Sequence, residues 1–161
     1  MKTKAISQFS AESSAVIACS KCFVSSAGVI LVLTGLAKVI SAMGSAKVLL
    51  EADPIVGVSF RSLIIAVGFL ELGIAGVCLF QLTKISSLIL IGWLASMFLV
   101  YRLGLILVHY HKPCSCLGHL SDALHISPNA VNIAMKIVLE YLLLGSFAML
   151  FWRLKAKWQL G

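Results

Sequence analysis

Four long apolar stretches dominate the sequence. They cover residues 24–43, 62–80, 85–108 and 130–152. A helix needs about 20 mostly apolar residues to cross the hydrocarbon core of a bilayer, and each stretch is close to that length. The sequence therefore predicts four transmembrane helices.

Composition supports this prediction. The chain has 161 residues, of which 60% are hydrophobic and 12% are charged, whereas roughly 25% of residues are charged in ordinary soluble proteins. The three prolines, Pro54, Pro113 and Pro128, all fall between the stretches, where their missing N–H groups leave no carbonyl unpaired in hydrocarbon. We expect an all-α fold, an integral membrane four-helix bundle with the lipid bilayer as its solvent.

The distribution of basic residues predicts the orientation of the bundle. Four crossings leave both termini on one side of the membrane, and this side holds seven of the lysines and arginines outside the stretches. They are Lys2, Lys4, Lys21, Lys84, Arg153, Lys155 and Lys157, against Lys47, Arg61 and Lys112 on the opposite side. The positive-inside rule then places both termini in the cytoplasm.

This orientation divides the chain into a cytoplasmic N-terminal segment (1–23), a four-helix domain (24–152) and a basic cytoplasmic tail (153–161). The net charge of +7 is explained by topology and contact with anionic headgroups. No basic run interleaved with aromatic residues is present, so we expect no nucleic-acid partner. In a bacterium the protein would lie in the inner membrane, with the loop at 109–129 facing the periplasm.

That loop contains the segment "HYHKPCSCLGH", in which most of the reactive side chains of the chain gather. A disulfide between Cys114 and Cys116 would require a tight turn, which Pro113 and Gly118 favour. A strained, exposed disulfide exchanges readily with thiols, and neighbouring cations favour the attacking thiolate. We therefore interpret Cys114 and Cys116 as a redox dithiol.

Two other interpretations of the segment stay open. His109, His111 and His119, with the two cysteines, offer nitrogen and sulfur ligands suited to zinc or copper, although the spacing fits no zinc pattern with a physical basis. Alternatively, the loop carries an inert disulfide, and the histidines simply lie at the membrane interface.

Three further cysteines precede this loop. Cys19 and Cys22 are three residues apart, which places them on one face of a helix, and Cys78 is expected at a similar depth. A second dithiol at Cys19 and Cys22 would allow electron relay across the membrane. The simpler interpretation is that these cysteines are small apolar residues of buried helices.

Five charged residues fall inside the stretches: Lys38, Glu71, Arg102, Lys136 and Glu140. Each is costly in hydrocarbon unless it is paired or faces a wet interior. At a rise of about 1.5 Å per residue, the three cations lie toward the periplasmic side and the two carboxylates near mid-depth. We expect an internal polar network beneath the dithiol loop, which either fixes helix packing or forms a pocket for a proton, a quinone headgroup or a substrate loop. Glycines in "GFLELG" (68–73), at Gly76 and in "GSFA" (145–148) should allow close approach of helices.

Several motifs together resemble the MauE/DoxX-like group of small four-helix membrane proteins. They are "TGLAKVIS", "GFLELGIAG", Arg102 and "KPCSCLG", in this order, and the similarity extends over about residues 24–150. The resemblance implies an integral four-helix bundle tied to redox metabolism, with the redox dithiol at Cys114 and Cys116. For the methylamine-utilisation members it implies maturation of the disulfide-rich small subunit of methylamine dehydrogenase, beside a thioredoxin-like partner. Leu117 departs from the aromatic residue expected at that place, and Cys19 and Cys22 match no pattern of the group.

The leading hypothesis is a membrane redox protein whose Cys114 and Cys116 exchange disulfides with a periplasmic thioredoxin-like or cysteine-rich client protein. Such an activity would be that of a thiol–disulfide oxidoreductase. No cofactor is required by the sequence, and a quinone or a metal is the alternative. The alternative function is a non-enzymatic membrane subunit or metal-binding scaffold of a redox complex.

Overall fold

The computed structural model describes residues 2–44, 49, 52–109 and 128–158. For residues 2–14 and 157 it describes the backbone alone. These ranges contain four helices and, apart from one isolated bridge, no β-structure. Helix α1 spans Lys2–Ala42, α2 Phe60–Phe80, α3 Ile85–Leu107 and α5 Pro128–Trp158. All four are long and apolar enough to cross a membrane, which confirms the predicted all-α four-helix membrane fold.

The predicted stretches agree with the observed spans at most ends. The apolar spans cover Ala15–Ala42, Phe60–Phe80, Ile85–Leu107 and Asn129–Ala156. The main difference lies in the first span, which begins nine residues before the predicted start at Val24 because α1 continues unbroken through the polar residues that precede it. No helix ends at either boundary of the proposed 24–152 domain, since α1 continues across residue 24 and α5 continues across residue 152.

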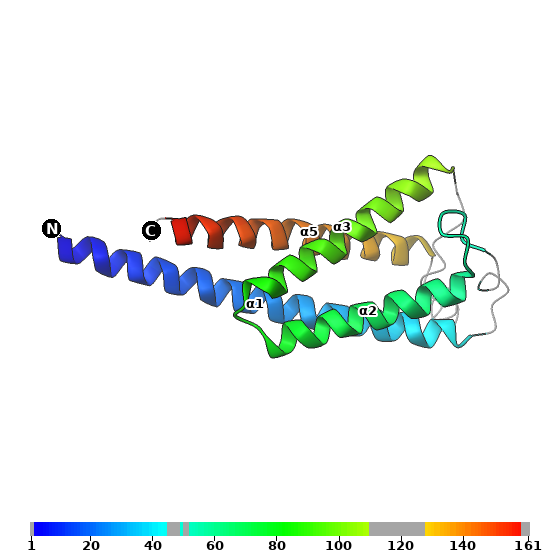
Figure 1. Cartoon of the computed structure of the whole chain (residues 1–161), viewed down its shortest axis with the longest axis horizontal. Helices are drawn as coiled ribbons and strands as arrows, with labels where there is room; N and C mark the ends of the chain where they lie inside the picture. Colours follow the sequence, from blue (N-terminus) through cyan, green and yellow to red (C-terminus); the bar gives the residue numbers. More distant parts are fainter. Residues whose placement is uncertain (1, 45–48, 50–51, 110–127, 159–161) are drawn as a thin grey trace.

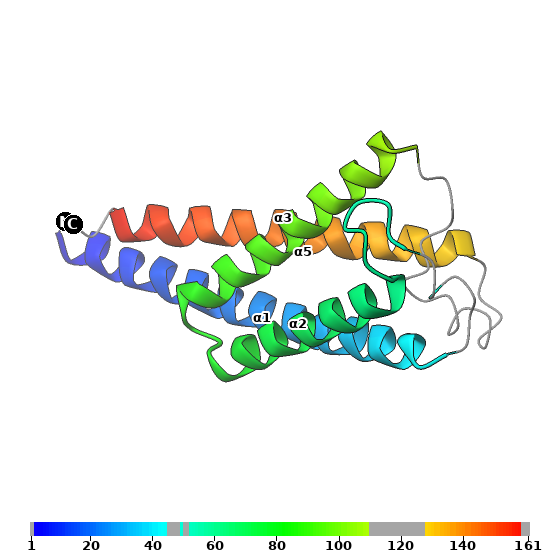
Figure 2. The same ribbon diagram turned by 45° about the vertical axis from the view of Figure 1, so that its right-hand side comes forward.

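The helices alternate in direction, so that the start of α1, the end of α5 and the short α2–α3 connection face one side of the bundle, called here the terminal end, where α1 and α5 project beyond the connection (Figure 1). Residues 52–59, the end of α3 and the start of α5 lie at the opposite end, called the loop end (Figure 2). Helix α1 packs mainly against α2, and α3 packs mainly against α5. The bundle therefore consists of two antiparallel helix pairs.

Local sequence explains where the helices begin and end. The Ser59 side chain accepts a hydrogen bond from the Ser62 backbone N–H at 3.4 Å, the usual way in which serine caps a helix start. Helix α5 begins with Pro128, whose fixed φ and missing N–H suit the first helical position. At the terminal end, the Arg153 guanidinium donates to the Thr83 carbonyl at 2.7 Å, which links α5 to the α2–α3 connection.

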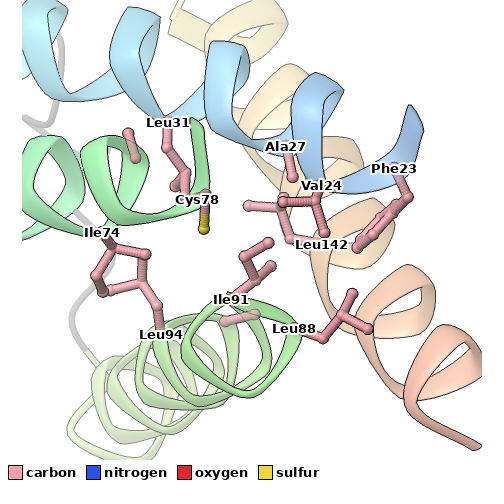
Figure 3. Packing of buried hydrophobic residues seen from close by; sticks show 12 residues of the cluster. Phe23, Val24, Ala27, Leu31, Ile74, Cys78, Leu88, Ile91, Leu94 and Leu142 are labelled. Carbon is pink, nitrogen blue, oxygen red and sulfur yellow. The ribbon is translucent and has the colours of Figure 1, made fainter. Parts of the chain in front are cut away.

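A hydrophobic core joins the four helices toward the middle of the bundle. Figure 3 shows side chains from every helix meeting there, including Val24, Cys78, Ile91 and Leu142. Several glycines lie where helices pack tightly, as expected for membrane helices. A Cβ added at Gly145 would lie 2.2 Å from the Phe23 ring.

Candidate functional site

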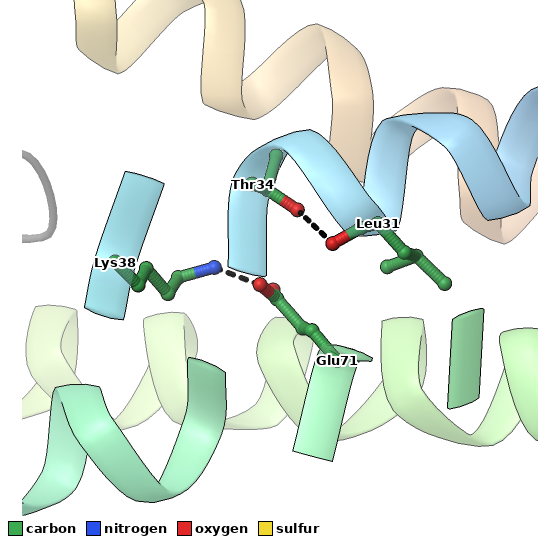
Figure 4. Close-up of polar contacts among 4 residues, drawn as sticks. All are labelled: Leu31, Thr34, Lys38 and Glu71. Carbon is green, nitrogen blue, oxygen red and sulfur yellow. Dashed lines mark hydrogen bonds and ion pairs between the residues drawn. The ribbon is translucent and has the colours of Figure 1, made fainter. Parts of the chain in front are cut away.

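The structure describes a buried ion pair beneath the loop end. Lys38 of α1 and Glu71 of α2 are joined through Nζ and Oε1, and their side chains are only 6% and 2% exposed (Figure 4). These are two of the five charged residues expected in an internal network. The pair is therefore a buried polar centre within the apolar bundle.

Two glycines explain how α1 and α2 come close enough to form this pair. A Cβ added at Gly35 would lie 3.0 Å from the Gly68 carbonyl oxygen, and one added at Gly68 would lie 3.1 Å from the Gly35 oxygen. Lys38 follows Gly35 by three residues, and Glu71 follows Gly68 by three. Side chains of a helix lean toward its N-terminus, so in this antiparallel pair the lysine and the glutamate lean toward each other.

The surroundings of the ion pair leave one acceptor unused. Lys38 Nζ lies 5.2 Å from the centroid of the Phe98 ring of α3, within the range of a cation–π contact. The Thr34 hydroxyl donates to the Leu31 carbonyl at 3.3 Å within α1 (Figure 4). Glu71 Oε2 is buried and has no hydrogen-bond partner among the described residues. The lysine is thus held by a carboxylate and an aromatic face.

Arg102 takes part in a separate contact nearer the loop end. Its Nη2 donates to the Asn132 side-chain oxygen at 2.7 Å, which joins α3 to α5. Asn132 was not expected from the sequence, because nothing in an apolar stretch indicates which polar residue of another helix an arginine will meet.

A hydrogen bond between Tyr101 and Asp53, also not expected from the sequence, fixes the loop at 52–59. Tyr101 donates its phenolic O–H to Asp53 Oδ2, while Asp53 Oδ1 accepts from the backbone N–H groups of Ile55 at 2.8 Å and Val56 at 2.9 Å. Burial raises the pKa of Asp53, but the hydrogen bonds from Tyr101, Val56 and Ile55 outweigh it, so that the pKa lies below its ordinary value. Only the Asp53–Pro54 dipeptide, typical of a turn, could have indicated this role.

Tyr101 and Arg102 are neighbours in the chain but make contacts on different sides of α3. Tyr101 ties α3 to the loop that connects α1 with α2, and Arg102 ties it to α5. The loop end of α3 is therefore held from both directions. This matters for function because α3 leads directly into the segment that carries the predicted dithiol.

That segment itself lies outside the described residues, and with it Cys114, Cys116, His111 and His119. His109 is described. It follows Val108, the C-cap residue of α3, and lies in the left-handed backbone region, at φ 53°, where histidine is among the residues tolerated in place of glycine. No group of three metal-ligating side chains occurs in the ranges that the structure describes.

The remaining predicted residues lie apart from the ion pair. Lys136 and Glu140 have exposed side chains on α5, and no hydrogen bond or ion pair joins them to Lys38 or Glu71 in the described part of the chain. Cys19 and Cys22 are free and exposed on α1, whereas Cys78 is free and buried in the core. The Cys78 thiol faces the Ser87 carbonyl at 3.9 Å. The structure thus joins two of the five charged residues and separates the other three from them.

Comparison with known proteins gives one match. The family model of methylamine utilisation protein MauE matches residues 15–154. The matched range covers the first three spans, the fourth span up to Leu154, and the segment with Cys114 and Cys116. No curated protein and no solved structure matches the chain significantly.

Proposed function

The chain belongs to the family of methylamine utilisation protein MauE, and on this premise we propose that it is a membrane redox protein that exchanges disulfides through Cys114 and Cys116. The observation that carries the proposal is the continuity of the match across 15–154, since it includes the "KPCSCLG" segment together with the first three spans and nearly all of the fourth. The redox dithiol is then part of the family domain and not an addition to it.

The proposed topology places the termini in the cytoplasm and the dithiol in the bacterial periplasm. Seven basic residues on the terminal side against three on the other support this orientation. The periplasm is a compartment in which disulfides form and persist. A partner protein with a thioredoxin-like fold or a cysteine-rich client protein would meet the dithiol there.

The exchange needs only the two cysteines and a partner. The Cys114 thiolate attacks a disulfide of the partner, which forms a mixed disulfide and releases one partner thiolate. The Cys116 thiolate then attacks Cys114, which closes the Cys114–Cys116 disulfide and releases the second partner thiolate. Two electrons pass from the dithiol to the partner, whose two thiolates take up the two protons lost by the cysteines. The reverse sequence oxidises a partner dithiol.

The described residues support the proposal through their position. The dithiol segment begins where α3 ends, and α3 is held at this end by the Tyr101–Asp53 and Arg102–Asn132 hydrogen bonds. The Lys38–Glu71 pair fixes α1 against α2 deeper in the bundle. We assign these groups a positioning role, in which they hold the ends of the reactive loop at a constant separation.

Trapping of mixed disulfides tests the proposal. A Cys116→Ser chain has lost the resolving thiol, so Cys114 should remain linked to its partner, and a non-reducing gel should show an adduct that reductant removes. The matched control is Cys78→Ser, which removes a buried core thiol and should capture nothing. Absence of any adduct, together with full activity of a Cys114→Ser/Cys116→Ser chain, would refute the proposed exchange.

A further inference from the structure

Helix α5 presents a regular row of exposed side chains away from the rest of the bundle. The row, called here the α5 stripe, consists of Ile133, Ile137, Glu140, Leu144, Phe147 and Phe151. Its spacing alternates between four and three residues, which is the heptad pattern of helices that pack along one another. The apolar members are between 55% and 69% exposed.

The opposite side of α5 accounts for its contacts within the chain. Leu142 and Ser146 are buried there, and the Tyr141 hydroxyl lies 2.7 Å from the Ser26 hydroxyl of α1. In an 18-residue apolar window of each helix, 11% of the residues are buried in α5, against 22% in α3 and 33% in α1 and in α2. Helix α5 is therefore the helix with the most surface left for lipid or for another protein.

The carboxylate of Glu140 distinguishes this surface from an ordinary lipid-facing one. Glu140 is exposed in the middle of the stripe and lies within the apolar span, where an unpaired charge is costly. Lys136, one turn earlier, is exposed as well, and no ion pair joins the two in the described structure. Lysine before glutamate at this spacing is also the less favourable order for pairing within a helix.

We propose that the α5 stripe is the interface of a homodimer in the membrane. A two-fold axis along the membrane normal would bring Lys136 of each copy toward Glu140 of the other, so that both charges are neutralised by two equivalent ion pairs. This self-complementarity favours a second copy of the chain over an unrelated partner, since an isologous interface needs one patch that matches itself. The apolar residues on either side of the charges complete the contact. The proposal does not depend on the proposed redox function.

Charge reversal tests the dimer with two differently tagged copies expressed together in one membrane. Lys136→Glu gives a chain with two acidic groups at the interface, and Glu140→Lys gives one with two basic groups. The self-association of each variant should be about tenfold weaker than that of the wild type, which corresponds to a loss of about 1.4 kcal/mol. Co-expression of the two variants with each other should restore pairing, because opposite charges then meet again.

The control is Lys155→Glu, which changes an exposed cation of α5 near its end and should leave pairing unchanged. All variants should keep the helical content and thermal stability of the wild type, which separates loss of pairing from loss of fold. Failure of the two variants to pair with each other would overturn the proposal. The proposal would also be overturned if the wild-type chain is monomeric in membranes and Glu140→Lys instead releases a different membrane protein.

Cross-linking gives a second readout that does not rely on charge. In a chain whose Cys19, Cys22, Cys114 and Cys116 are replaced by serine, Leu144→Cys should form an intermolecular disulfide on oxidation. Leu103→Cys, at a half-exposed position of α3, should not. Equal cross-linking at the two positions would indicate random collision and contradict a specific interface.

Discussion

Lys38 and Glu71 form an ion pair across α1 and α2 while both side chains are almost completely shielded from solvent. Their helices touch at Gly35 and Gly68, one turn away from the charges. The close backbone contact and the buried ion pair thus belong to the same crossing of α1 and α2. Their contributions to stability can be measured separately, because the ion pair depends on charge and the backbone contact depends on side-chain volume.

Loss of one charge should be far more damaging than loss of both. Glu71→Gln or Lys38→Met leaves a buried charge without its partner, and we expect either to lower the free energy of unfolding by about 3–5 kcal/mol. The Lys38→Met/Glu71→Gln double variant should recover a large part of this loss. A double-mutant cycle of unfolding in detergent measures the coupling, and additive effects of the two substitutions would contradict the ion pair.

Addition of one methyl group at the helix crossing should also destabilise the bundle. At Gly35 a Cβ would meet the Gly68 carbonyl at 3.0 Å and the Leu72 side chain at the same distance. Because backbone cannot move aside cheaply, Gly35→Ala should cost about 1–3 kcal/mol. Gly73→Ala is the matched control, since nothing lies within 4 Å of its Cβ position. There the better helix propensity of alanine should leave stability unchanged or raise it by up to about 1 kcal/mol. The same unfolding measurement compares the two, and an equal effect would argue against the close crossing.

The loop at 52–59 should respond to acid through Asp53. Its pKa in the folded protein lies below the ordinary value of 3.8, so the folded state favours the ionised carboxylate. This contribution to stability is complete above the ordinary pKa and is lost as the pH falls through the lower, folded-state value. Thermal unfolding measured between about pH 6 and pH 3 should therefore show a loss of stability that Asp53→Asn lacks.

Tyr101→Phe separates the phenolic hydrogen bond from the rest of the Asp53 contacts. It removes one of the hydrogen bonds that lower the pKa of Asp53, so the acid-dependent loss should shrink and move to higher pH. The cost at neutral pH should be about 1.5–3 kcal/mol, the usual range for a hydrogen bond to a charged group. An unchanged pH profile in Tyr101→Phe would show that the tyrosine does not stabilise the carboxylate.

The helices could be predicted from the sequence because bilayer thickness translates directly into the length of an apolar run. The candidate span in α1 begins nine residues before the predicted stretch, since Lys21 and the serines around it interrupt the apolar pattern without interrupting the helix. In this part of α1 the residues still favour a helix although their hydropathy is lower. Helix propensity and hydropathy therefore indicate different starting points for the first span.

The pairing of charges was beyond the sequence for a different reason. Lys38, Glu71, Lys136 and Glu140 all lie in apolar stretches. Because each helix is apolar on nearly every side, the sequence pattern does not show which face of the helix points into the bundle. The structure turns Lys38 and Glu71 inward and Lys136 and Glu140 outward. Likewise, the contact between Asp53 and Tyr101 joins residues 48 positions apart, and no local pattern announces it. Cys114 and Cys116 stay a prediction, because they lie outside the described residues.

Labelling with a membrane-impermeant thiol reagent tests whether Cys114 and Cys116 lie on the periplasmic side and are reversibly oxidised. Cys114 and Cys116 should be modified in intact cells after treatment with a reductant and should be protected without it, because we propose that they lie outside the cytoplasmic membrane and form a reversible disulfide. Cys19 and Cys22 serve as the internal control, since they should be modified only when inverted vesicles expose the cytoplasmic side. Modification of Cys114 and Cys116 from the cytoplasmic side alone, or no effect of reductant on their labelling, would contradict the account.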